Sequence, residues 1–144
     1  MPHAESVWAR STRVQIVDET YVDASPTLVA AVLTHPYNVA NAWPHLRTRL
    51  IAQRGDEGAI WEVDGHLRGE IEVWIEPCWD GAIVHHYVRA EAAAGRAAAV
   101  EKAHVRRWKN AITAIKDRLE PPRNTWSFDG GASIRSRTPS ASTS

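Results

Sequence analysis

The sequence predicts an α+β domain in which a curved antiparallel sheet of about five strands wraps around a long C-terminal helix. Two observations carry this prediction. Between residues 48 and 90, segments with alternating apolar side chains are separated by glycine-containing turns, a pattern typical of an antiparallel meander. The segment 97–119 then contains neither proline nor glycine and repeats apolar residues at helical spacing.

The N-terminal part predicts one strand and two short helices. Residues 13–22 place β-branched or aromatic side chains at about every second position, which predicts a first strand. Ser25 can cap a helix that begins at Pro26, and the pair His35-Pro36 ends it. A second short helix or turn over 37–43 ends before Pro44, because the residue before a proline avoids the helical conformation.

The remaining elements follow from the same patterns. Four strands are predicted over 48–53, 59–64, 69–76 and 82–90. In the last helix, one apolar stripe repeats at 3-4-3-4 spacing and comprises Val105, Trp108, Ile112, Ile115 and Leu119. This stripe must pack on the sheet.

Length and composition describe one domain of 144 residues, of which 44% are apolar. We expect residues 12–120 to fold and residues 1–11 and 121–144 to be disordered, because the C-terminal segment has too few large apolar groups to offset the entropy of ordering it. A single cysteine, Cys78, excludes an intramolecular disulfide and a multi-thiolate metal site, so we expect a protein of the reducing cytoplasm. No apolar run approaches the ~20 residues that span a bilayer, and we expect no contact with membranes.

Charge is balanced in total but divided between elements. The 17 basic and 17 acidic residues argue against nonspecific binding to nucleic acid. Residues 62–76 nevertheless carry five acids against Arg68, whereas residues 96–118 carry seven bases against two acids. The basic helix leaves open a third class of function, a module that binds a partner through this face. We expect no nucleic-acid partner, because Trp108 belongs to the apolar stripe and the bases to a solvated face.

Several short motifs together resemble a known family. They are Trp43-Pro44-His45-Leu46, Trp61-Glu62-Val63-Asp64-Gly65, Gly69-Glu70-Ile71-Glu72-Val73-Trp74-Ile75-Glu76-Pro77, and Asp80-Gly81 followed by His85 and Arg89. In these residues the chain resembles the bacterial polyketide cyclase/dehydrase branch of the START-like (SRPBCC) superfamily. The resemblance, over about residues 14–120, implies a helix-grip fold that holds an apolar ligand between the sheet and the last helix, which would make 12–120 a ligand-binding domain. Members include cyclases, lipid carriers and proteins with no assigned substrate, and fuller members have around seven strands.

Two neighbouring strands concentrate the candidate site residues. Alternation puts acids and a tryptophan on one face of 69–76, namely Glu70, Glu72, Trp74 and Glu76. If Ile75 pairs with Val84, the opposite partners are Glu70 with Arg89, Glu72 with Tyr87, and Trp74 with His85. The sheet then has one polar-aromatic face and one aliphatic face.

The pattern allows either face to cover the helix. Charged residues are rarely buried without a partner, which favours an arrangement with the acidic face in water and the aliphatic face packed on the helix. The alternative, which we favour because exposed aromatic residues would be odd and because of the family resemblance, turns the polar-aromatic face inward as a ligand site. The predicted ligand-binding residues are Trp61, Glu72, Trp74, Tyr87 and Trp108. An aliphatic outer face would then predict a homodimer that buries it.

The place of Trp61 depends on the turn that follows it. A two-residue connection at His66-Leu67 pairs Trp61 with Glu72 on the polar face, whereas a three-residue connection pairs it with Val73 among the aliphatic residues. We favour the first, since Glu72 could accept a hydrogen bond from the indole N–H.

Acid–base chemistry would fall to His85 and Arg89, the predicted catalytic residues. His85 has the pKa range for proton transfer, and Arg89 or Tyr87 could stabilise an oxyanion in an aldol cyclisation. A histidine and an arginine in a sheet are more often structural than catalytic, so the sequence favours structural roles for both. We expect no metal, because His85 and His86 point to opposite faces, and no cofactor, because no glycine motif forms a phosphate loop. His104 is interpreted as a surface or boundary residue.

The sequence therefore predicts a domain that binds a small apolar or aromatic molecule between sheet and helix. The first hypothesis is a polyketide cyclase/dehydrase-like protein. The second is a noncatalytic carrier or sensor of a lipid or aromatic metabolite. Whether the protein is an enzyme is left open by the residues.

Overall fold

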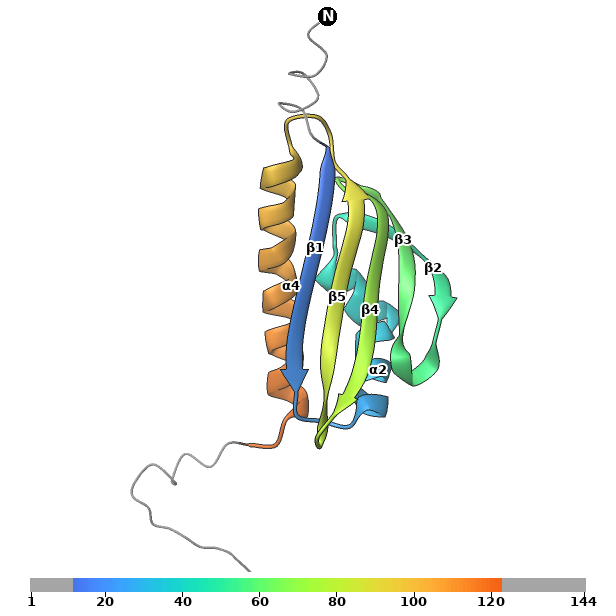
Figure 1. The fold of residues 1–144 in the computed structure, drawn as a ribbon, viewed down its shortest axis with the longest axis vertical. Coiled ribbons are helices and arrows are strands. Elements are labelled where there is room, and N and C mark those ends of the chain that lie inside the picture. Colours follow the sequence, from blue (N-terminus) through green and yellow to red (C-terminus); the bar gives the residue numbers. More distant parts are fainter. Residues whose placement is uncertain (1–11, 123–144) are drawn as a thin grey trace, which may run out of the picture.

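The computed structural model describes residues 12–122 and contains one antiparallel sheet with helices packed against it (Figure 1). In chain order the elements are β1 (Arg13–Val22), α2 (Pro26–Thr34), α3 (Pro36–Ala42), β2 (Leu46–Gln53), the 3₁₀ turn η1 (Gly55–Glu57), β3 (Gly58–Gly65), β4 (Arg68–Cys78), β5 (Gly81–Glu91) and α4 (Ala97–Leu119). The five strands lie in the order β1-β5-β4-β3-β2. The predicted α+β architecture is confirmed. The segments predicted to be disordered, 1–11 and 121–144, lie outside the described residues except for positions 121 and 122.

Helix α2 begins and ends where the sequence predicts, and α3 is displaced by one residue from its predicted range 37–43. The Ser25 hydroxyl accepts a hydrogen bond from the Leu28 N–H at 3.1 Å, and Pro26 takes the first helical position of α2. His35 ends α2 and caps α3, because its Nδ1 accepts from the Tyr37 N–H at 3.1 Å. These two helices place Trp43 directly after α3.

The pairing of β4 with β5 follows the predicted register. Ile75 lies opposite Val84, and the partners Glu70 with Arg89, Glu72 with Tyr87, and Trp74 with His85 are all present. Both strands have 11 residues, so they form the longest ladder of the sheet. At the far edge β2 pairs with β3 through a register shift between Leu50 and Ala52.

The orientation of the sheet differs from the one we favoured. The core is a single cluster that joins Ile71 and Val73 of β4 to Val29 of α2 and Ile112 of α4. His86, which shares a face with Val84 and Val88, stacks on Trp108 of α4 with ring centroids 4.1 Å apart. The aliphatic face therefore covers the helices, and the polar-aromatic face turns away from them. Figure 1 shows α4 running alongside β1 and α2 lying behind the sheet.

The physical reason for this orientation is that the acids of the outer face have cationic partners there. Glu72 lies 2.8 Å from Arg54 and 3.2 Å from Arg89, and Glu62 lies 2.6 Å from Arg49. Ion pairs at a wet surface avoid the desolvation cost of burying charge, whereas the apolar stripe of α4 gains from an apolar partner. Because the aliphatic face is covered, the reason given for a homodimer no longer holds.

The predicted pairing of Trp61 with Glu72 is wrong. Trp61 lies opposite Ile71 and is 4% exposed within the aliphatic core, while Ile60 lies opposite Glu72. The turn is wider than either alternative, since the last pair before it is Val63 with Gly69. Gly69 has a φ of 155°, and a side chain there would collide with the carbonyl of Arg89, so glycine permits this path.

Candidate functional site

Five aromatic side chains meet between the sheet and α4, and we call them the inner cluster: Trp43, Trp61, His86, His104 and Trp108. Trp43 comes from the end of α3, Trp61 from β3, His86 from β5, and the other two from α4. Each of the five is at most 5% exposed. The cluster therefore joins α3, the sheet and α4 at one place.

Most rings of the inner cluster are nearly parallel. The ring of Trp43 is inclined by 16° to those of His86 and His104 and by 21° to that of Trp108, with centroids 5.8 to 6.3 Å away. Trp61 closes one side edge-on at 5.5 Å. Parallel and edge-on faces of this kind are the surfaces on which a planar aromatic molecule packs well.

The two histidines form a buried hydrogen-bonded pair. His86 Nε2 lies 3.0 Å from His104 Nε2, so one nitrogen donates and the other accepts. Burial holds the pKa of His86 well below its usual range, and the neighbouring His104 lowers it further, whereas Asp18 acts in the opposite direction. Burial lowers the pKa of His104 to about 4, helped by the charges of His66 and Arg107. Both rings are therefore neutral at pH 7.

Asp18 fixes the position of Trp108 from the neighbouring strand. Its Oδ2 accepts from the Trp108 indole N–H at 3.0 Å, and its Oδ1 pairs with Lys109. Burial acts to raise the pKa of Asp18, but the hydrogen bonds from Lys109 and Trp108 outweigh it, so the pKa lies below its usual value. The carboxylate stays ionised and holds the indole in one orientation.

Two polar atoms of the inner cluster, Trp43 Nε1 and His86 Nδ1, have no hydrogen-bond partner among residues 12–122. The indole Nε1 of Trp43 is buried without a hydrogen bond, although the residue is only 3% exposed. An unsatisfied buried donor of this kind costs about 1 to 3 kcal/mol. A hydrogen-bond acceptor that reached this atom would remove that cost.

The outer face gathers the other predicted site residues. His85 stacks on Trp74 at 4.2 Å and on Tyr87 at 5.9 Å. Its Nε2 lies 2.8 Å from Glu76, and its Nδ1 lies 3.2 Å from Glu19 at an angle that does not make a hydrogen bond. The ring is thereby covered by neighbouring side chains and held between two carboxylates.

The structure thus divides the predicted set between two faces. Glu72, Trp74, His85, Tyr87 and Arg89 lie together on the outer face, where Arg89 also lies 3.6 Å from Glu70. Trp61 and Trp108 lie in the inner cluster. One cavity beneath α4 cannot contact both groups, so a catalytic role of His85 and Arg89 remains a prediction that concerns the outer face.

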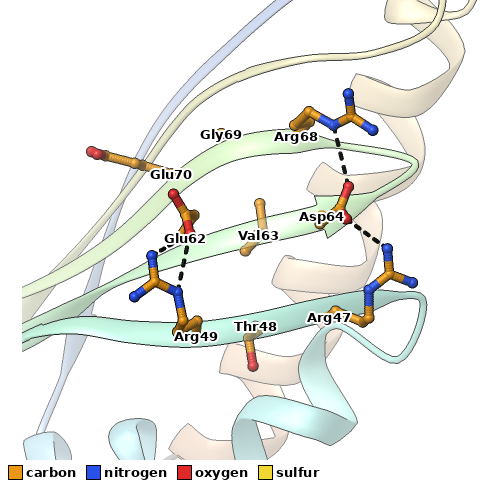
Figure 2. Close-up of a pocket in the computed structure, with 9 residues that line it drawn as sticks. All are labelled: Arg47, Thr48, Arg49, Glu62, Val63, Asp64, Arg68, Gly69 and Glu70. Atoms are coloured by element: carbon orange, nitrogen blue, oxygen red, sulfur yellow. Dashed lines mark hydrogen bonds and ion pairs between the residues drawn. The ribbon is translucent and has the colours of Figure 1, made fainter.

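A shallow depression of about 550 Å³ lies on the part of the outer face formed by β2, β3 and β4 (Figure 2). Asp64 lies between Arg47 and Arg68, at 2.6 and 3.2 Å, and Arg49 pairs with Glu62. Glu70, which also lines the depression, has Arg89 as its partner. The charges that line this depression are therefore already balanced, which makes it a poor site for a charged ligand.

Three residues of the inner cluster were missed as site residues. His104 precedes Trp108 by four positions, which puts both on one helix face, so its interpretation as a surface or boundary residue is wrong at 1% exposure. His86 alternates with Val84 and Val88, and this places it on the aliphatic face. Trp43 carried no periodic signal. Its position depends on how α3 meets the sheet.

Residues 12–122 bring together no group of three or more histidine, cysteine, aspartate or glutamate side chains that could hold a metal ion. In the same range no helix has the length and apolar character needed to cross a bilayer.

Comparison with known proteins gives a likeness of structure alone. No protein-family model matches the chain, and no curated protein matches it in sequence. Among solved structures, the Aha1 dimer from Colwellia psychrerythraea has a TM-score of 0.58 and 15% identity, covering 77% of this chain and 99% of that one. The chain has the helix-grip fold. This confirms the fold implied by the START-like resemblance.

Two further solved structures are similar. A protein from Deinococcus radiodurans has a TM-score of 0.54 and 12% identity, and the match covers 73% of this chain and 96% of that one. A conserved protein of unknown function from Enterococcus faecalis has a TM-score of 0.53 and 11% identity, covering 83% of this chain and 82% of that one. At such identities the likeness extends to the fold and no further.

Proposed function

We propose that the protein binds a small apolar or aromatic molecule between its sheet and α4, against the inner cluster. The observation that carries the proposal is a buried set of nearly parallel aromatic rings that includes the unpartnered Nε1 of Trp43. A core of Leu, Ile and Val would pack as densely without burying a histidine pair and a free indole N–H. A ligand that stacks on the rings and accepts from Trp43 would offset that cost.

The finer proposal is a polyketide cyclase/dehydrase-like role, and its support is the motif resemblance. Orientation of a reactive chain in a shaped site can supply much of the rate of an aldol cyclisation. For a substrate beneath α4, the nearby proton acceptors are the neutral His86 and His104. For a substrate on the outer face, they are His85 and its carboxylate partners. The single cysteine supports placing this activity in the cytoplasm.

The alternative is a noncatalytic carrier or sensor, which needs only the aromatic site. Native mass spectrometry of the full chain purified from its host separates the two roles. A carrier retains its ligand, whereas a cyclase releases product. If the protein is a cyclase working on the outer face, replacing His85 and Arg89 changes the product distribution, and unchanged products remove both residues from the chemistry.

Two tryptophans on opposite faces give a matched test of where the ligand binds. Trp108 lies beneath α4 and Trp74 on the outer face, and each stacks on a histidine. We expect Trp108→Phe to weaken the binding of 2-naphthol, a neutral planar probe, about three- to tenfold in isothermal titration calorimetry. Trp74→Phe should change the affinity less than about twofold.

The reverse result would place the site on the outer face, around Trp74, His85 and Tyr87. Failure of the wild-type protein to bind 2-naphthol, together with no retained small molecule in native mass spectra, would refute the proposal. Circular dichroism of both variants serves as the control that each has kept its fold.

A further inference from the structure

A second pocket, of about 200 Å³, opens at the N-terminal end of α4. We call it the α4 pocket, and its lining residues are His45, His66, Arg96, Ala99, Val100, Ala103 and Arg107. Every ionisable side chain in this lining is of a basic type. We infer that the α4 pocket binds a small oxyanion, a carboxylate or a phosphate group.

Three segments distant in sequence build the α4 pocket. His45 precedes β2, His66 lies in the turn between β3 and β4, and the other residues come from the first turns of α4. Positions 96, 99, 103 and 107 follow the spacing of one helix face, and the small side chains of Ala99 and Ala103 leave space between the two arginines. The fold therefore brings the basic groups together around a hollow.

The bases of the α4 pocket differ from five arginines in or beside the sheet in having no acidic partner. Arg47, Arg49, Arg54, Arg68 and Arg89 all form ion pairs with carboxylates. Within residues 12–122, no carboxylate forms an ion pair with any of the four ionisable residues of the α4 pocket. A small anion would supply the missing counter-charge, and guanidinium groups bind carboxylate and phosphate oxygens with favourable geometry.

His66 lies beside the basic residues of this lining. Its ring lies 6.1 Å from that of His45. Burial lowers the pKa of His66, and the charges of His45 and Arg107 lower it further, while a hydrogen bond with the His45 backbone acts against them. The charges of His66 and Arg107 also contribute to the low pKa of the buried His104. The positive potential of Arg107 therefore reaches both His66 and His104, and a bound anion would reduce it.

The N-terminal end of α4 adds to the positive potential in the α4 pocket. Its first turn contains no acidic residue, and the Arg96 side chain makes no capping hydrogen bond. The N-terminal end of a helix carries a partial positive charge and free N–H groups. The α4 pocket, bounded here by Ala99 and Val100, thus joins side-chain and backbone attraction for an anion.

The test uses NMR spectra of the full chain with labelled histidine. Phosphate is titrated at pH 7.0 while sodium chloride keeps the ionic strength constant, and acetate is titrated separately. We expect the ring signals of His45 and His66 to move and then saturate with at least one anion. His35, an exposed histidine between α2 and α3, is the internal control and should not move. The anion that binds more tightly identifies the group preferred by the pocket.

A pair of neighbouring arginines gives the matched variants. Arg107 lines the α4 pocket, whereas Arg106 is exposed on α4 outside it. Arg107→Ala should weaken anion binding about tenfold, and Arg106→Ala less than about twofold. Signals that drift without saturation, equal movement of His35, or equal effects of the two substitutions would overturn the inference. These results do not depend on whether a molecule binds at the inner cluster.

Discussion

The buried His86–His104 pair makes the stability of the protein depend on pH in a defined direction. The pKa of His104 is lowered from 6.5 to about 4 by burial and by nearby positive charge. Between these two values the unfolded chain binds a proton that the folded chain does not. The free energy of unfolding is therefore not reduced by this residue above about pH 6.5, and it falls as the pH decreases towards 4. His86 acts in the same direction, because its pKa is also lowered.

The size of the effect follows from the His104 pKa. A change from 6.5 to about 4 corresponds to a maximum of about 3 kcal/mol, and linkage places about 2 kcal/mol of it between pH 7 and pH 5. Urea unfolding at pH 7, 6 and 5, followed by circular dichroism, measures this loss as the free energy of unfolding in water. We expect the wild-type protein to lose at least this amount, since His86 adds to it.

His104→Gln isolates the contribution of this residue. Glutamine keeps a polar partner for His86 but cannot take up a proton, so the loss between pH 7 and pH 5 should shrink by about 2 kcal/mol. The exposed His35→Asn variant, which keeps a capping side chain at the start of α3, is the control and should retain the wild-type dependence. A His104→Gln profile that runs parallel to the wild-type profile would show that the pair does not carry the pH dependence.

Three further substitutions test particular contacts by urea unfolding. Asp18→Asn should cost about 1 to 3 kcal/mol at pH 7, because Lys109 loses its anionic partner; an unchanged stability would count against this role. Gly69→Ala should abolish folding or cost several times more than Gly55→Ala, since a side chain at Gly69 meets backbone of β5 whereas Gly55 faces open space; similar losses would contradict the argument. Ser25→Ala should cost about 1 kcal/mol through loss of the α2 cap, and a change below about 0.3 kcal/mol would refute it.

The strands and their register could be predicted because their signals are local. Alternation in β4 and β5, with a turn of fixed length between them, determined which residues lie opposite each other. The start of α2 could be predicted equally well, since a capping serine followed by proline acts over a few residues. Such features need no knowledge of distant partners.

The inward face of the sheet and the position of the site could not be predicted, because both depend on contacts between segments that are distant in sequence. Glu72 is stable on a wet face because Arg54, far away in sequence, reaches it. The stack of Trp74 on His85 removes much of the cost of leaving this aromatic surface on the outer face, so the half-buried Trp74 was misread as a ligand wall. Trp61 was misplaced because the unusual backbone of Gly69 changes the turn by one register step. Each error came from a contact between segments that the alternation pattern does not describe.

The register shift in β2 has a consequence for how copies of the protein meet. An open sheet leaves unpaired backbone groups along its border, and these can recruit a strand from another molecule. The shift between Leu50 and Ala52 breaks the straight run of such groups along β2. Arg47 and Arg49 add bulky charge to the same border. The edge strand β2 thus has two features that oppose edge-to-edge aggregation, the register shift and the charged side chains.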